Sequence, residues 1–234
     1  MIKVTYLDHS AFLVELTHHV LLFDPAAITP PPIPAGKSLY VFASHAHSDH
    51  YTSAIFQLPA AAFFLGHDIA VEESAASVHS MAPHESCREG DLLVHTLFST
   101  DEGVAFIVEC EGACIYHAGD LNDWHWNEDP PAVQQWMKER YVQELQLLAP
   151  FAPSVAFVVL DPRLQEHAAD GMDAFVANVA ASAIVPMHLW GDHALARAYQ
   201  RSHSQLPIYV YEHPNTSFLL EDLSEKERSS SAER

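Results

Sequence analysis

Basic side chains are scarce in this sequence. Its 234 residues include 11 Lys and Arg against 31 Asp and Glu, which gives a formal net charge of −20, and the basic residues form no run. Nucleic-acid-binding surfaces depend on clustered Lys and Arg that neutralise phosphates. The composition therefore argues against a nucleic-acid partner, and most of the acidic excess is typical of a solvated surface.

Cysteine is also scarce. Three residues, Cys87, Cys110 and Cys114, are too few for a disulfide framework, and their number is odd. The last two flank a predicted hairpin turn at Glu111 and Gly112, in which Cys110 would face Ala113 and the two thiols would point to opposite faces. We interpret all three as small buried hydrophobic residues in a reducing compartment.

Long apolar runs are absent as well. No run reaches the length of a membrane span, and the first residues, "MIKVTYLDHS", alternate like a strand rather than like a leader peptide. Hydrophobic residues still make up 49% of the chain, which is typical of a globular protein with a sizeable core. We expect a cytoplasmic protein with no membrane partner; the sequence does not indicate its oligomeric state.

Strand-like and helix-like segments follow one another in a repeated order. Three alternating runs at the start predict an antiparallel meander, and the proline-rich "ITPPPIPAGK" must be a loop. The apolar run "SLYVFAS" then predicts a buried strand. Further strands are expected at 91–98, 103–110, 113–119, 154–160, 183–189, 207–211 and 217–221, and helices at 130–149, 172–182 and 193–202.

This order, strands and then helices, twice over, predicts a fold class. Two sheets packed face to face with helices outside would bury the apolar side of each element. We therefore expect an α/β (α+β) fold with two mixed β-sheets. A single domain would span residues 1–222, and the polar tail at 223–234 should be disordered.

Histidine is concentrated in the stretch "SHAHSDHY", directly after the predicted buried strand. Residues two apart in an extended chain point the same way, so His45 and His47 can bind one ion. Asp49 and His50 follow where the chain begins to coil, and they can face a second position a few ångströms away. Imidazole and carboxylate together suit Zn²⁺, Mn²⁺ or Fe²⁺, so the motif predicts one or two divalent metal ions.

The pattern His-x-His-x-Asp-His after a strand resembles the metallo-β-lactamase superfamily of metal-dependent hydrolases. "LDHSAFLVEL" followed by "LLFDP" is similar to the opening of the branch that includes ascorbate-6-phosphate lactonase, with Asp8 in place of a glycine. "IYHAGD" resembles the strand that carries the bridging aspartate, here Asp120, and "IVPMHLW" the strand that carries the last histidine, here His188. The resemblance spans residues 2–220 and implies a four-layer αβ/βα sandwich.

The resemblance also implies roles for these residues. Asp120 ends a strand after Gly119, and its carboxylate can bridge two metal ions that together lower the pKa of a shared water molecule. Asp49, if it is not only a ligand, could orient the nucleophile or take its proton. One ion would be held by His45 and His47, the other by Asp49, His50 and His188, with Asp120 between them.

One position departs from the family. Most members supply a third histidine to the first metal before a strand such as "GVAFIVE", but here the chain reads "FSTDEGVAF". Asp101 is the nearest group that can bind a metal, and a carboxylate ligand would favour Mn²⁺, Fe²⁺ or Mg²⁺ over Zn²⁺. Alternatively "STDEG" is only a turn, and His84 or His95 completes the first site.

Four further residues are weaker candidates. His9 could orient a ligand or cap a turn. His117 precedes the bridging aspartate by three residues and could also orient a ligand, and the sequence favours a hydrogen-bonding role in the core over a role as a ligand. Trp124 could line a pocket or simply pack. Arg163 ends an apolar strand and should point towards the metals, where it could grip an anion or pair with a nearby carboxylate.

These observations favour hydrolysis of a small-molecule substrate by a metal-bound hydroxide. Because the chain is strongly negative, a local arginine near the metals indicates a small anionic substrate, which would be a lactone, an ester or a phosphodiester. Two other classes remain open. The chain could be a di-iron redox or metal-sensing protein, or an inactive scaffold with a weakened first metal site.

Overall fold

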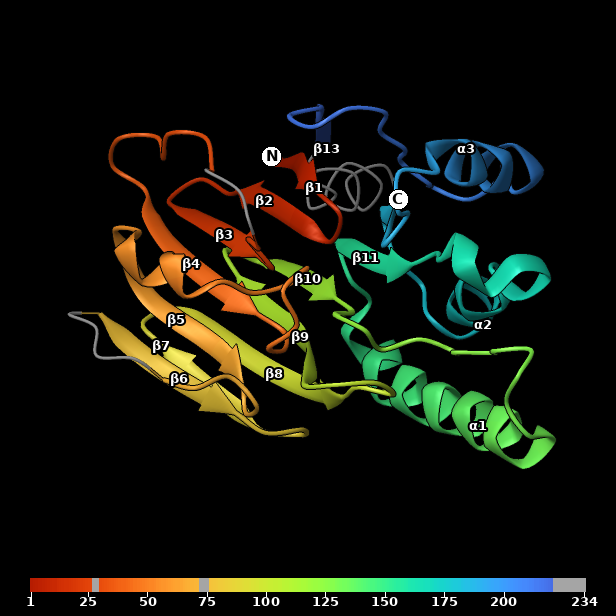
Figure 1. The fold of residues 1–234 in the computed structure, drawn as a ribbon. Helices are drawn as coiled ribbons and strands as arrows, with labels where there is room; N and C mark the ends of the chain where they lie inside the picture. Colours follow the sequence, from red (N-terminus) through yellow and green to blue (C-terminus); the bar gives the residue numbers. More distant parts are fainter. Residues whose placement is uncertain (27–29, 72–75, 221–234) are drawn as a thin grey trace, which may run out of the picture.

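The computed structural model describes residues 1–26, 30–71 and 76–220. Two β-sheets lie face to face, and the α-helices lie beyond the second of them (Figure 1). Among the described residues the first sheet has the strand order β13-β1-β2-β3-β4-β5-β6. Its strands are β1 (Ile2–Asp8), β2 (Ala11–Glu15), β3 (His19–Phe23), β4 (Ser38–Ala43), β5 (Ala60–Gly66), β6 (Ser77–Met81) and β13 (Ser217–Leu220).

The second sheet has the order β12-β11-β10-β9-β8-β7 within the same described ranges. Its strands are β7 (Ser86–Glu89), β8 (Leu92–Phe98), β9 (Val104–Cys110), β10 (Ala113–His117), β11 (Val155–Val159) and β12 (Ile184–Met187). The helices are α1 (Pro131–Leu148), α2 (Asp170–Asn178) and α3 (His193–Ser202), with 3₁₀ helices η1 (Ser53–Gln57), η2 (Ala149–Phe151) and η3 (Pro162–His167). None of these helices combines the length and the apolar character that crossing a membrane requires.

Both sheets are mixed, as the sequence predicts. The opening meander β1-β2-β3 is antiparallel, and β3 to β6 are parallel neighbours. In the second sheet β7 to β10 are antiparallel, whereas β10, β11 and β12 run parallel. The parallel strands β3, β4, β11 and β12 are almost wholly buried, which explains why they read as continuous apolar runs.

The β9–β10 hairpin has the predicted register. Glu111 and Gly112 both have positive φ, 51° and 75°, the turn geometry that matches the twist of a two-residue hairpin. Cys110 pairs with Ala113, and both Cys110 and Cys114 are buried free thiols. The prediction for Cys87 is wrong, since this residue is only partly buried and its Sγ lies 3.3 Å from His79 Nδ1.

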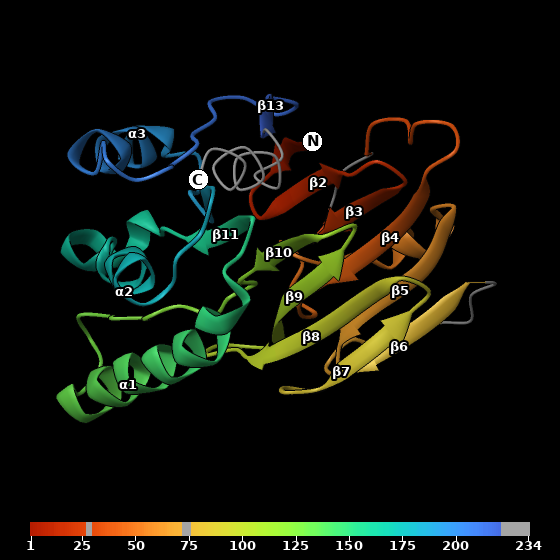
Figure 2. The ribbon, with the colours of Figure 1, turned by 180° about the vertical axis from the view of Figure 1, so that it is seen from behind.

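Side chains on each strand alternate between two cores. In β2, Phe12 and Val14 join the main core between the sheets, whereas Leu13 faces an outer cluster. The outer cluster is covered by η1, through Ile55 and Phe56, and by loop residues such as Ile33. Among the described residues, therefore, the layer over the first sheet is a 3₁₀ turn with loops, while α1 and α2 contact the second sheet and α3 packs beside α2 (Figure 2).

Some details differ from the sequence-based expectation. Residues 207–211 do not form a strand: an isolated bridge joins Ile184 to Ile208, and Pro207 contributes only its carbonyl because proline has no N–H to donate. Strands β5, β6 and β7 and the 3₁₀ helices were not predicted individually. The expected disorder at 223–234 lies outside the described residues.

The topology brings many loops to one edge. Strands β1, β3 and β4 of the first sheet and β10, β11 and β12 of the second all end there, and β9 begins there because it is antiparallel to β10. The candidate histidines and aspartates lie in these loops.

Candidate metal centre

The centre of the site is the carboxylate of Asp120, three residues after the end of β10. Its Oδ1 lies 3.2 Å from His50 Nε2 and 3.4 Å from His188 Nε2. Its Oδ2 lies 3.6 Å from His45 Nε2. Three imidazoles from both sheets therefore surround one carboxylate, and all four side chains are almost completely buried.

These atoms are at ion-pair distance but lack hydrogen-bond geometry. The Nε2 atoms of His45, His50 and His188 and the Oδ1 atom of Asp120 are all buried without a hydrogen-bond partner in the described part of the chain, and His9 Nε2 is in the same state. Buried polar atoms without partners are rare in native proteins because each costs free energy. A cluster of them facing one point fits divalent cations, for which imidazole and carboxylate are suitable ligands.

The opposite nitrogen of each imidazole is fixed. His50 Nδ1 donates to Asp24 Oδ2 at 2.7 Å, and His188 Nδ1 donates to Asp161 Oδ2 at 2.8 Å. His45 Nδ1 lies 2.9 Å from Ser44 Oγ, which itself donates to Asp24. With the proton on Nδ1, the Nε2 lone pair of each ring points to the centre, as in metal sites where a carboxylate orients the ligating histidine.

Asp24 and Asp161 were not among the residues predicted from sequence. A signal was nevertheless present, because each follows an apolar strand and precedes a proline, in Asp24-Pro25 and Asp161-Pro162. Burial opposes the charged form of both, but His117 and His50 bring the pKa of Asp24 well below its ordinary value. Hydrogen bonds from His188 and Arg163 likewise lower the pKa of Asp161 to about 2.

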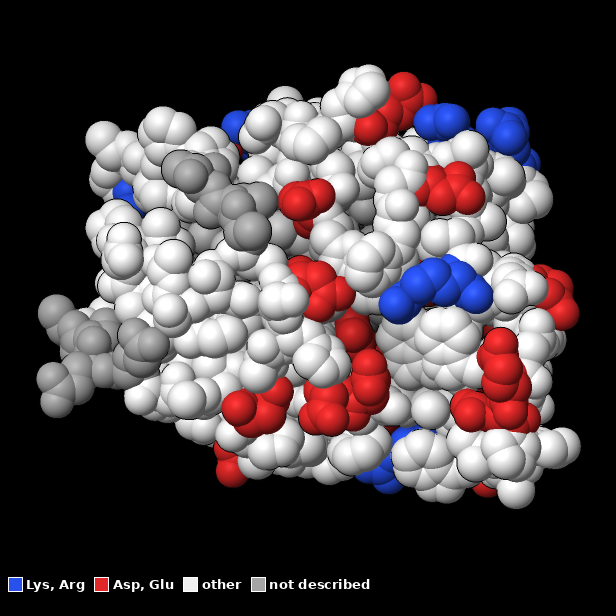
Figure 3. All heavy atoms as spheres, in the orientation of Figure 1, with Lys and Arg blue, Asp and Glu red and all other residues white. Residues whose placement is uncertain are grey.

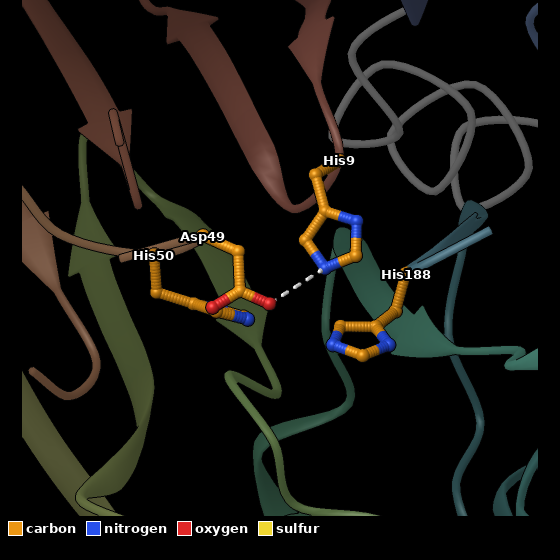
Figure 4. Close-up of side chains that lie close together, drawn as sticks. All are labelled: His9, Asp49, His50 and His188. Atoms are coloured by element: carbon orange, nitrogen blue, oxygen red, sulfur yellow. Dashed lines mark ion pairs between the residues drawn. The ribbon is translucent and has the colours of Figure 1, made fainter. Parts of the chain in front are cut away.

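The second position contains Asp49, His50, His188 and His9 (Figure 4). One ligand atom of each lies within 4.8 Å of the others. His9 comes from the turn after β1; its Nε2 is 3.6 Å from Asp49 Oδ2, and its ring centroid is 4.2 Å from that of His188. The predicted second metal position is therefore assembled in space, with His9 as an additional candidate.

The first position contains His47, Asp101 and Asp120, again within 4.8 Å of one another. Asp101 lies in the turn before β9, and burial and Asp120 raise the pKa of its carboxyl group. The two alternatives lie elsewhere: His84 pairs with Glu144 of α1, and His95 pairs with Glu109 and Ser86. Geometry therefore favours Asp101 over either histidine.

Glycines allow this close packing. Gly103 has φ +66°, and a Cβ added there would lie 2.1 Å from the Ser44 carbonyl oxygen and 2.5 Å from His45 Cβ. The Val104 N–H donates to the same Ser44 oxygen at 3.1 Å. The turn that carries Asp101 thus lies directly against the strand end that carries His45.

Several residues without glycine's freedom also have left-handed backbones here. The φ angles of His9, Asp24, His188 and Trp190 are 36°, 43°, 64° and 47°. Such conformations cost on the order of 1 kcal/mol or more each and cluster at functional sites. These backbone conformations bring the four side chains to the edge at which the strands end.

The carboxylates of this donor set favour positive charge. Burial opposes the charged form of His50, yet Asp120 and Asp24 raise its pKa to about 9. Burial and the neighbouring His188 and His50 lower the pKa of His9 to about 4, so His9 is neutral at pH 7. The carboxylates therefore stabilise a proton on His50, and a metal ion bound at His50 Nε2 would displace that proton, whereas His9 is already available as a neutral ligand.

The remaining candidates surround the centre. Trp124 is buried; its Nε1 donates to the Asp120 carbonyl at 2.8 Å, and its ring meets His188 edge-on. His117 donates from Nε2 to the Ser10 carbonyl and accepts from the Gly119 N–H, so both ring nitrogens bind backbone.

Arg163 pairs with Asp161, the second of the two outcomes that the sequence left open. Its Nε donates to both Asp161 oxygens at 3.0 and 2.9 Å, and its guanidinium lies 4.5 Å from the ring centre of Trp190. Trp190 is half exposed beside His9 and His188. Arg163, Asp161 and His188 therefore form a continuous chain from the surface to the centre.

Comparison with known proteins identifies the family. A family model described as "Beta-lactamase superfamily domain" matches residues 3–130, more than half of the chain. The chain belongs to the metallo-β-lactamase superfamily, and its two mixed sheets with flanking helices have that fold.

The individual proteins that resemble this chain share only a modest fraction of identical residues with it. The chain is 26% identical over 207 residues to a "UPF0173 metal-dependent hydrolase" of Alkaliphilus metalliredigens, covering 80% of this chain and 84% of that protein. Igni18, a metallo hydrolase of Ignicoccus hospitalis, has a similar structure, with a TM-score of 0.66, 20% identity, and coverage of 94% and 99%. CmlA, a diiron β-hydroxylase of Streptomyces venezuelae, matches with a TM-score of 0.60 and 10% identity, over 94% of this chain but 54% of that one.

Proposed function

We propose that this protein, a metal-dependent hydrolase of the metallo-β-lactamase superfamily, binds two divalent metal ions on either side of Asp120 and cleaves a small anionic substrate. The observation that carries the proposal is the set of buried, unpartnered Nε2 atoms that converge on the Asp120 carboxylate. A single domain over residues 1–222 would supply the whole site.

The two positions have different ligand sets. The first ion would be held by His45, His47, Asp101 and Asp120. The second would be held by Asp49, His50, His188 and Asp120, with His9 as a further nitrogen donor. The extra carboxylate at the first position makes its ligand set harder in the sense of hard and soft ligands. Such a set favours Mn²⁺ or Fe²⁺ over Zn²⁺.

When bound, the ions would activate a water molecule and polarise the bond that it attacks. The chain's own groups prepare this step. Asp24 and Asp161 keep the protons of His50 and His188 on Nδ1, so that Nε2 remains a ligand. Asp49 is only partly buried, and it is the carboxylate placed to orient a water molecule or accept its proton.

An anionic substrate is supported by the local charge. Acidic side chains outnumber basic ones on the face drawn in Figure 3, and such a surface repels anions unless a local cation meets them. Asp161 uses the Nε and Nη2 atoms of Arg163, which leaves Nη1, at the partly exposed end of the side chain, for a carboxylate or phosphate. Trp190 beside it could cover an apolar part of a lactone, an ester or a phosphodiester.

A redox function is the second candidate. A carboxylate in place of an imidazole at Asp101 suits iron, and the diiron hydroxylase CmlA shares the fold. Visible absorption by the purified, iron-loaded protein, together with oxygen consumption and no hydrolysis, would favour this function.

The test is a substrate screen of metal-free protein reloaded separately with Mn²⁺, Fe²⁺ or Zn²⁺. We expect hydrolysis of at least one anionic lactone, ester or phosphodiester, lost on chelation and restored by metal. His47→Ala should lose it, whereas His213→Ala, an exposed histidine outside the site, should retain it. Hydrolysis that survives chelation or the His47 substitution would contradict the proposal.

A further inference from the structure

Two histidines stack on each other outside the site around Asp120. His125 lies in the loop between β10 and α1, and His167 ends η3; their ring centroids are 3.6 Å apart with an interplanar angle of 17°. Both Nδ1 atoms approach the same oxygen, Asp170 Oδ2, at 3.1 and 2.9 Å. We call His125, His167 and Asp170 the peripheral cluster.

The peripheral cluster lies in a negative environment. Asp123 is buried and its Oδ1 has no hydrogen-bond partner among the described residues. Imidazoles beside carboxylates are a donor set for a cation.

The spacing of the donors fits a metal ion. Ligands bound at about 2.0–2.1 Å in a tetrahedron are separated from each other by roughly 3.3 Å. The Nδ1-to-Oδ2 distances of 3.1 and 2.9 Å are close to that value, and all three donor atoms lie within 4.8 Å of one another. The two rings are nearly parallel, and the lone pair of each Nδ1 lies in its own ring plane, so the rings would have to tilt towards each other to bind one ion. A fourth position would be open to water.

The surrounding structure holds the donors in place. Asp170 is the first residue of α2, and Gly171 lets α2 approach the loop so closely that an added Cβ would lie 1.8 Å from Asn122 Oδ1. Asn127 of the loop also donates to Glu166 at 3.2 Å. The two segments that carry the histidines are thus joined independently of any ion.

We propose that the peripheral cluster is a separate binding site for Zn²⁺ or a similar divalent transition-metal ion. Two imidazoles and one carboxylate with an open fourth position are a common zinc ligand set. The ion would fasten the loop that carries Trp124 to the segment that carries Arg163. It would therefore stabilise one wall of the main site without entering it.

The proposal is tested by measuring how many zinc ions each chain binds. Wild-type protein and the His125→Ala/His167→Ala double variant are dialysed against the same Zn²⁺ series, and zinc per chain is measured by mass spectrometry. We expect the double variant to bind about one ion fewer, while His213→Ala binds as much as wild type. The same pair of substitutions in a His47→Ala background should again remove about one ion, which separates this site from the one around Asp120.

Folding is checked by circular dichroism of the metal-free proteins. If the double variant does not fold, Asp170→Asn replaces it, because the amide keeps the shape and a hydrogen-bond acceptor but removes the charge. This variant should bind the same ion at least tenfold more weakly. Equal zinc binding by wild type and these variants at every concentration would overturn the proposal and leave the cluster as a pair of hydrogen bonds.

Discussion

At the scale of single residues, the orientation of the imidazoles depends on carboxylates behind them. Asp161 is fully buried and binds both His188 and Arg163. It therefore fixes the ring that faces Asp120 and at the same time holds an arginine at the rim of the site. The effect of Asp161 on metal binding should exceed what its distance from the centre suggests.

We expect Asp161→Asn to weaken binding at the second position by about 10- to 100-fold, because the amide cannot match the carboxylate in holding the Nδ1 proton of His188. Competition with a chromophoric chelator measures the affinity. Glu139→Gln, an exposed acidic residue on α1, is the control and should bind metal like wild type. An unchanged affinity in Asp161→Asn would show that the hydrogen bond does not orient His188.

Asp101 determines how strongly the first position binds a metal ion and which metal ion it prefers. We expect Asp101→Ala to lose most of one metal ion per chain, and Asp101→His to shift preference from Mn²⁺ towards Zn²⁺, since imidazole is the softer ligand. Parallel titrations with the two metals give both results. If both variants titrate like wild type, the segment "STDEG" is only a turn.

At the scale of elements, the site depends on how closely the turns approach the end of β4. An added Cβ at Gly103 or at Gly66 would lie 2.1 Å from the Ser44 carbonyl oxygen, and Gly103 also has a positive φ. Gly36 also has a positive φ, +84°, but nothing lies within 4 Å of its added Cβ. Gly103 and Gly36 therefore separate backbone strain from packing.

Gly103→Ala should destabilise the protein by about 2 kcal/mol or more, the sum of left-handed strain and a clash with Ser44. Gly36→Ala should cost about 1 kcal/mol, from strain alone. Urea unfolding of the two variants gives the difference. Equal losses would mean that the turn can move away from Ser44 freely.

The sequence predicted the elements better than it predicted the contacts between them. The motif at residues 45–50 is local, and the rule that parallel strands end at one edge of a sheet brings Asp120 and His188 to it. The partners Asp24 and Asp161 were missed because each pairs with a histidine 26 or 27 residues away, and that pairing follows from neighbouring strands rather than from spacing. The pairing of Arg163 with Asp161 is local, only two residues apart, and the sequence had left it open as one of two outcomes.

At the scale of the whole molecule, the two sheets are joined by Glu111. This residue lies in the β9–β10 turn of the second sheet, and its carboxylate accepts hydrogen bonds from the Thr17 and His18 N–H groups of the first. It also lies 2.6 Å from His19 Nδ1. Although burial opposes this, these hydrogen bonds lower the pKa of Glu111 from 4.5 to about 2.

The sign of the pH dependence follows from this pKa. Because the folded pKa is the lower one, the ionised Glu111 stabilises the fold above pH 4.5, and the contribution is lost as the pH falls towards 2. We expect Glu111→Gln to lower the Tm at pH 7 and to differ less from wild type at pH 3. Thermal unfolding across this range measures it, with Glu139→Gln as the control. A constant difference at all pH values would point to packing instead of charge.

Anomalous diffraction from crystals grown with Mn²⁺ or Zn²⁺ can test whether Asp120 lies between two metal positions. We expect two anomalous peaks beside the Asp120 carboxylate, one bonded to His45 Nε2 and the other to His50 Nε2 and His188 Nε2. Fully loaded crystals with no peak within bonding distance of Asp120 would contradict it.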